Sequence, residues 1–160
     1  WMSRVAEVIR RGFVITIDYG YTATDLYAPS RHAGTFLCYH KHQTNEEPYE
    51  RVGCQDMTAH VDFTRLQDVG RKRSLSTLYF GQQYQFLMAL GFLELLIEMT
   101  TRETDPQKAQ ALRMTLKTLI LPDSGMGESF KVLVQGKNVG SPKLDCQRRI
   151  QDITLPGTLI

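Results

Sequence analysis

The hydrophobic pattern of the first 17 residues predicts a helix followed directly by a strand. Gly12 ends the helix, because a glycine after the last turn readily takes the positive φ that closes a helix. Residues 13–17 (Phe-Val-Ile-Thr-Ile) are apolar and rich in β-branched side chains, which is typical of a strand covered on both faces inside a parallel sheet. The apolar face of the helix is expected to comprise Trp1, Val5, Val8 and Ile9, which recur at helical spacing.

The predicted strand ends at Asp18, Tyr19 and Gly20, where a carboxylate meets a turn. In open α/β sheets the ligand crevice lies at the carboxyl ends of the strands, so chemistry is expected here. Asp18 could accept a proton, bind a substrate nitrogen, or accept backbone N–H groups of the turn. The residues alone leave these three interpretations open.

The rest of the chain alternates between loops and periodic segments. Residues 21–55 show little periodicity, and a loop of that length inside a domain is more often functional than idle. A helix is expected next, capped by Asp56 or Thr58, with Asp62 in its first turn and Gly70 at its end. Further elements are predicted as a strand over 75–80, a buried helix over 86–99, a helix opened by Asp105 and Pro106, a tight turn at 125–127 and a strand over 130–134.

This pattern predicts an α/β protein with few strands. A doubly wound sheet usually has five or more strands, and no capping residue precedes the first helix. We therefore expect the carboxyl-terminal half of a larger α/β enzyme over residues 1–136, followed by an irregular tail over 137–160. The alternative is a small α/β domain of unusual shape.

Composition limits which classes of partner and which cellular compartment we expect. The 160 residues carry 19 lysines and arginines against 17 aspartates and glutamates, a net charge of +2, which indicates no nucleic-acid partner. The longest apolar stretch, residues 86–99, contains Gly91, Glu94 and Glu98 and is too short for a membrane span. Three cysteines without a spacing framework favour reduced thiols in a cytosol-like compartment.

Cysteines and histidines in the long loop raise the question of a metal. Their Cys-x-His-x-His spacing differs from the ligand pairs of closed zinc sites, so we expect polar histidines and one buried thiol rather than a metal site. His60 and Asp62 would point in different directions on a regular helix, which argues against a charge-relay pair. The residues weighed as ligands are Cys38, His40, His42, Cys54 and His60.

Five blocks of the chain together resemble the MidA family of S-adenosylmethionine-dependent methyltransferases, which includes the mitochondrial arginine methyltransferase needed for complex I assembly. The blocks follow the family's order over most of the chain, and the third is the most specific. They are GFVITIDYGY at 12–21, RHAGTFLCYH at 31–40, DMTAHVDF at 56–63, QYQFLMALG at 83–91 and MGESFKVLV at 126–134.

The resemblance implies a class I, Rossmann-like methyltransferase fold. Residues 13–17, 75–80 and 130–134 would be its fifth, sixth and antiparallel seventh strands, so the chain would be the carboxyl-terminal part of that fold. The glycine-rich motif and the acidic residue that bind the methyl donor have no counterpart in this sequence. S-adenosyl-L-methionine would then be bound mainly by residues upstream of Trp1, and the chain alone would be inactive.

The resemblance also implies a substrate, a protein arginine of a respiratory-complex subunit, in the bacterial cytoplasm or the mitochondrial matrix. Carboxylates orient a guanidinium, so Asp18 is the first catalytic candidate and Asp62 the second. Tyr19, Gly20 and His60 would border the substrate cleft. The alternative is a non-catalytic binding or assembly module derived from the same family.

One expectation concerns the surface. The side of the predicted strand at 13–17 that the missing strands would cover should be apolar. It should be either exposed or buried by self-association, which allows a homo-oligomer.

Overall fold

A four-stranded sheet forms the centre of the computed structural model, which describes residues 1–41, 43–121 and 126–148. Its strand order is β5-β1-β7-β6, and β7 lies antiparallel between β1 and β6. The mixed α/β architecture and the antiparallel last strand are as expected. The strands are β1 (Gly12–Tyr21), β5 (Val61–Asp62), β6 (Ser76–Gln82) and β7 (Phe130–Lys137).

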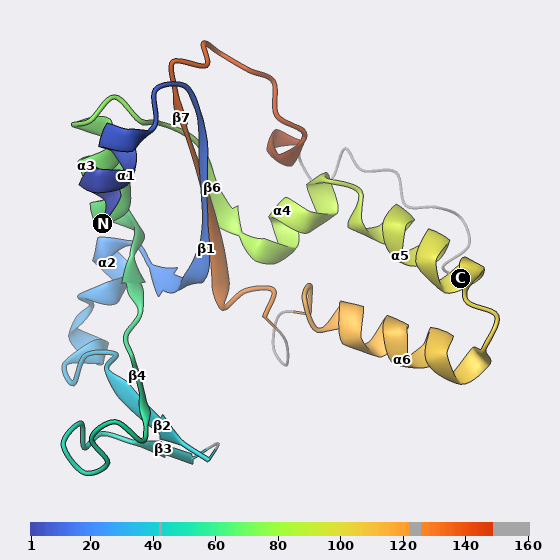
Figure 1. The fold of residues 1–160 in the computed structure, drawn as a ribbon, viewed down its shortest axis with the longest axis horizontal. Helices are drawn as coiled ribbons and strands as arrows, with labels where there is room; N and C mark the ends of the chain where they lie inside the picture. Colours follow the sequence, from blue (N-terminus) through green and yellow to red (C-terminus); the bar gives the residue numbers. More distant parts are fainter. Residues whose placement is uncertain (42, 122–125, 149–160) are drawn as a thin grey trace.

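Two helices cover one face of this sheet, α1 (Met2–Val8) and α3 (Phe63–Arg71) (Figure 1). The core there contains Met2, Ala6, Val14 and Leu75. The predicted inner face of α1 was partly wrong, since Trp1 and Val8 are 71% and 81% exposed. Met2 and Ala6 take the inner positions instead, and Val5 and Ile9 pack beside them.

The other face is covered by α4 (Gln83–Ala89) and a 3₁₀ turn at Asp145–Gln147. Phe86 and Cys146 pack there against Val132 and Val134 of β7. The helices α5 (Phe92–Arg102) and α6 (Pro106–Lys117) extend from this side as a hairpin (Figure 1).

The single buried helix expected over 86–99 was wrong. Gly91 takes a φ of 88° and separates α4 from α5, and Leu90 and Leu95 are exposed. The start of α6 is as expected, because the Asp105 side chain accepts hydrogen bonds from two backbone N–H groups and Pro106 holds the first helical position. No helix within the three described ranges is long and apolar enough to cross a membrane.

A second, small sheet lies where a long loop was expected. Its strand order is β3-β2-β4, and it follows α2 (Ala23–Leu26) and a 3₁₀ turn at Pro29–Arg31. Asp56 and Thr58 are therefore strand residues and not helix caps; α3 begins at Phe63, and Asp62 is its N-cap. The strands of the small sheet are β2 (Leu37–His40), β3 (Gln43–Asn45) and β4 (Asp56–Thr58).

The face of β1 on the α4 side is open. Phe13, Ile15 and Ile17 are 46%, 57% and 50% exposed there, and within the described part of the chain α4 packs mainly against β6 and β7. Among the described residues, the outer edge of β1 is paired only at Gly20 and Tyr21. The expectation of a strand covered on both faces was thus wrong for this part of the chain, whereas the expectation of an exposed apolar face is confirmed.

Two predicted segments fall partly outside the described residues. Outside the described residues lie Gly125, in the turn predicted at 125–127, and residues 149–160 of the predicted tail. The division at residue 136 stays a prediction; β7 continues to Lys137.

Buried glutamines provide a test of the packing. Gln135 of β7 is fully buried, and its side-chain nitrogen and oxygen find no hydrogen-bond partner among the described residues. An unsatisfied buried amide costs about 1–3 kcal/mol, so Gln135→Met should raise the free energy of unfolding by about that amount. Gln83 is also buried, but its Nε2 donates to the Leu119 carbonyl at 2.9 Å.

The matched Gln83→Met variant should therefore lower the free energy of unfolding, by about 1 kcal/mol. Urea unfolding of the three proteins measures both changes. Equal shifts of the same sign in the two variants would contradict this account of Gln135.

Candidate functional site

Aromatic rings gather around His60 at the carboxyl end of β1. The Tyr19 and His60 rings meet edge to face with centroids 5.3 Å apart, and the centroid of the Tyr21 ring lies 5.1 Å from that of His60. Phe130 of β7 packs against Tyr19, and the Arg31 guanidinium lies 4.0 Å above the centre of the Tyr21 ring. A predicted cleft residue, His60, is thus held directly against the predicted Tyr19.

The backbone contact between β1 and β5 produces this arrangement. Gly20 is paired in parallel with Val61, and a Cβ on Gly20 would lie 2.2 Å from the Val61 carbonyl oxygen. Only a residue without a side chain permits this approach, which brings the neighbouring His60 to the strand end. Gly20 therefore has a packing role, and its contact with a substrate stays a prediction.

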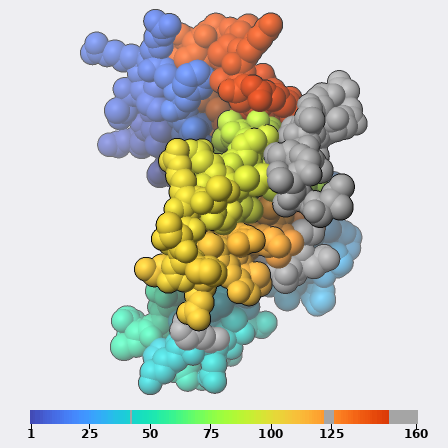
Figure 2. All heavy atoms as spheres, turned by 90° about the vertical axis from the view of Figure 1, so that its right-hand side faces the viewer, coloured from blue at the N-terminus to red at the C-terminus, as the bar shows by residue number. Residues whose placement is uncertain are grey.

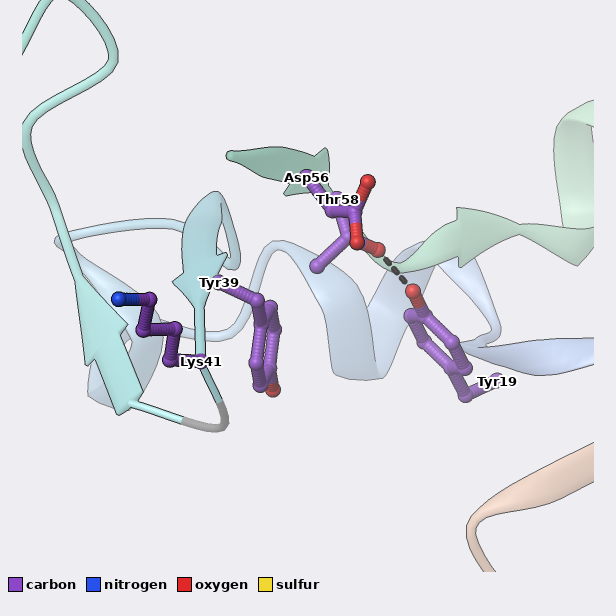
Figure 3. A pocket seen from close by; sticks show the side chains of 5 residues that line it. All are labelled: Tyr19, Tyr39, Lys41, Asp56 and Thr58. Carbon is purple, nitrogen blue, oxygen red and sulfur yellow. Dashed lines mark hydrogen bonds between the residues drawn. The ribbon is translucent and has the colours of Figure 1, made fainter. Parts of the chain in front are cut away.

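A cavity of about 480 Å³ lies between the end of β1 and the small sheet (Figure 3). The Tyr19 hydroxyl is hydrogen-bonded to the Thr58 hydroxyl and so joins β1 to β4 across 39 positions of sequence. Along β2 and β4 the side chains alternate between the two faces of the small sheet. The lining residues are Tyr19, Tyr39, Lys41, Asp56 and Thr58.

The two predicted catalytic carboxylates are placed differently. The expected turn at Asp18 was wrong, because β1 continues to Tyr21 and Asp18 is paired with Lys131 of β7. The Asp18 Oδ1 accepts the Tyr19 backbone N–H at 2.8 Å. Neither Asp18 nor Asp62 lines the cavity, and His60 borders a separate cavity beside Arg31. The Asp62 Oδ1 accepts the Arg65 backbone N–H at 2.9 Å as the cap of α3, and its Oδ2 accepts the Tyr27 hydroxyl at 3.5 Å.

Burial shifts the pKa values of His60 and Tyr19 in the direction that favours their neutral forms. Burial lowers the pKa of His60 below its usual 6.5, the Arg31 charge lowers it further, and Asp18 opposes both effects. Burial raises the pKa of Tyr19 above 10.0, and the charges of Asp18 and Tyr39 add to this. The cavity therefore combines two tyrosine rings with the Asp56 carboxylate, and the His60 ring lies against Tyr19, which suits a polar or cationic nitrogen group.

The cysteines and histidines of the small sheet form no metal cluster in the ranges that the structure describes. All three cysteines are free; Cys38 is buried on β2 and Cys54 is exposed. The Nδ1 atom of His40 is hydrogen-bonded to the Cys54 carbonyl oxygen at 2.7 Å. His42 lies outside the described residues.

Sequence reasoning missed four of the lining residues as site residues: Tyr39, Lys41, Asp56 and Thr58. Their alternation over two short segments was the available signal. It was weak because each segment presents only two positions to the cavity.

Comparisons with known proteins agree on one family. Residues 1–81 match the family model described as "Putative S-adenosyl-L-methionine-dependent methyltransferase". A COG1565 superfamily member from Burkholderia thailandensis bound to S-adenosyl-homocysteine is 30% identical, with a TM-score of 0.82 over 92% of this chain and 38% of its own. A native structure of a superfamily protein from that organism has the same identity and TM-score and is 39% covered. No curated protein matches the chain.

The pKa of His60 gives a pH prediction. Because the folded protein binds this proton less readily than the unfolded chain, the free energy of unfolding should fall as the pH drops below about 6.5. The loss should level off below the pKa of His60 in the folded protein. In His60→Gln this part of the pH dependence should be absent. Chemical unfolding at several pH values between 5 and 8 measures the difference, and parallel profiles for the two proteins would contradict it.

Proposed function

The chain belongs to the S-adenosyl-L-methionine-dependent methyltransferase family of this model, and from that premise we propose that it forms the acceptor side of a methyl-transfer cleft. The chain spans less than two fifths of the length of these solved relatives. The observation that carries the proposal is the cavity at the end of β1, closed by the bond between Tyr19 and Thr58. Strand ends are where α/β proteins bind their substrates.

The acceptor that fits the cavity best is an arginine side chain of a protein. A guanidinium stacks on aromatic rings and pairs with carboxylates, and the cavity offers the Tyr19 and Tyr39 rings together with the Asp56 carboxylate. Lys41 lies at the side of the cavity formed by the small sheet (Figure 3). Its positive charge favours a guanidinium that enters from the opposite side, toward Tyr19.

Asp18 and His60 have separate roles in this proposal. Methyl transfer is an in-line displacement and depends on holding the reacting atoms at near-attack distance. Asp18 adjoins Tyr19 along β1 without lining the cavity, and its charge would orient a cationic acceptor held there. His60, whose ring lies against Tyr19, would accept the proton that the nitrogen loses as its new bond to carbon forms.

The described residues do not fit the methyl donor itself. Nucleoside cofactors in this class of fold are bound by a glycine-rich turn between a strand and a helix and by an acidic residue for the ribose hydroxyls. After β1 the chain instead enters the four-residue α2 through Thr22, which caps it with its own side chain. We therefore assign S-adenosyl-L-methionine binding mainly to residues outside this chain.

We further propose a subunit of a respiratory complex as the target, in the bacterial cytoplasm or the mitochondrial matrix. This finer assignment rests on the resemblance of the five sequence blocks. In the alternative, a non-catalytic assembly module, the same cavity would bind the arginine without methylating it. Substitution of Asp18 separates the two functions.

In a methyltransferase that contains this chain, Asp18→Asn should lower the rate of arginine methylation at least about tenfold, because a charge-assisted contact contributes about 1.5–3 kcal/mol. Binding of the methyl donor should change little. Asp68→Asn is the matched control, since Asp68 is an α3 carboxylate with a side chain 45% exposed and paired with Arg71 at 3.4 Å. Equal methylation rates in both variants would remove Asp18 from the site.

The assignment of the donor can be tested on this chain alone. Titration calorimetry with S-adenosyl-L-methionine should give weak binding or none, because the described residues lack the donor cradle. Submillimolar binding would contradict this prediction. S-adenosyl-homocysteine serves as a second probe, since it lacks the transferred methyl group and its charge.

A further inference from the structure

The small sheet has a second side that the proposed acceptor site does not use. Asp56 and Thr58 point to the cavity beside Tyr19, and Gln55 and Met57 point the other way. On that side lies a groove of about 420 Å³, which we call the outer groove. It is lined by Phe36, Pro48, Tyr49, Val52, Gly53, Gln55 and Met57.

The outer groove is apolar and open to solvent. Tyr49, Val52 and Met57 are 87%, 77% and 61% exposed, and they belong to a lobe at the lower end of the molecule (Figure 2). Large apolar side chains gathered on such a projecting surface mark an interaction site.

Hydrogen bonds hold the wall of the groove in one shape. Asn45 accepts the Glu47 backbone N–H at 2.9 Å through its side-chain oxygen and donates to the Gln55 side chain at 3.1 Å. Gln55 in turn donates to the Glu47 carbonyl at 2.8 Å. A groove fixed in this way binds a partner without first having to order its own loop.

The charge around the groove is negative. Residues 46–55 hold three glutamates against one arginine, a net charge of −2 in a chain whose total is +2. Glu46, Glu47 and Glu50 are all exposed, and among the described residues only Glu50 forms an ion pair, with Arg51 at 3.5 Å. Nucleic acids and anionic membranes are repelled by such a surface, whereas a basic polypeptide is attracted.

We propose that the outer groove binds a basic polypeptide segment, with one large apolar side chain of that segment inserted among Tyr49, Val52 and Met57. The glutamates would contact the basic residues on either side. That this basic segment belongs to the methyl-acceptor protein rests on the proposed function. In that case β4 would hold the docked segment on one face and the target arginine on the other.

The probe is a short synthetic peptide with lysines on both sides of one phenylalanine and no arginine. It should bind the 160-residue chain in calorimetry, and binding should weaken as salt is added. Val52→Asp should weaken binding at least about tenfold, because it removes the apolar contact from the groove. Leu95→Ser on α5 is the matched control, since Leu95 is 51% exposed and lies away from the groove.

A second pair of variants tests the charges. Glu46→Gln with Glu47→Gln should weaken binding and reduce its salt dependence, whereas Glu94→Gln with Glu98→Gln, on α5, should do neither. No binding by the unaltered chain, or equal losses in test and control variants, would overturn the proposal.

Sedimentation velocity tests whether a second copy of the chain, and not a basic segment, occupies the outer groove. If Val52→Asp changed the oligomeric state and left peptide affinity intact, the groove would be a self-association surface and the proposal would be wrong. Val52 lines the outer groove and not the acceptor cavity, so a loss of peptide binding in its variant reports on the groove alone. Failure of docking and failure of methyl transfer are therefore distinguishable.

Discussion

The close approach of β1 and β5 at Gly20 is the contact on which the site depends. It brings the Val61 backbone so near that a methyl group on residue 20 would overlap the Val61 carbonyl. Through this contact His60 reaches the rings at the end of β1, and the chain that leads out of the small sheet is fixed beside them. The hydrogen bond between Tyr19 and Thr58 then closes the cavity. A main-chain constraint at one glycine thus positions side chains of β1, of β4 and of His60, the residue before β5.

The parts of the fold that could be predicted are those in which one segment carries its own signal. The apolar strands β1, β6 and β7 follow from runs of β-branched and aromatic residues, and α6 follows from Asp105 and Pro106. The small sheet could not be found in this way, because β3 is only Gln43–Asn45 and is polar. Such strands form through pairing with partners elsewhere in the chain, and local pattern does not contain that information.

The candidate site shows the same division. Tyr19 and His60 were found because a strand end and a specific sequence block point to them, and the structure brings them together. Tyr39 and Lys41 were missed, because their position depends on how β2 turns back toward β1. Asp62 stays a catalytic prediction, although both of its carboxylate oxygens already accept hydrogen bonds, from the Arg65 backbone N–H and the Tyr27 hydroxyl. The open face of β1 belongs to the predictable part, since three large apolar residues alternate there.

The distribution of the three thiols has a practical consequence. Cys38 and Cys146 are buried, and burial raises the pKa of Cys146, which lowers its reactivity at neutral pH. Cys54 is exposed and follows directly on Gly53 of the outer groove. A maleimide dye should therefore attach to Cys54 in preference to the other two, so the unmodified sequence already supplies a fluorescent reporter beside the groove.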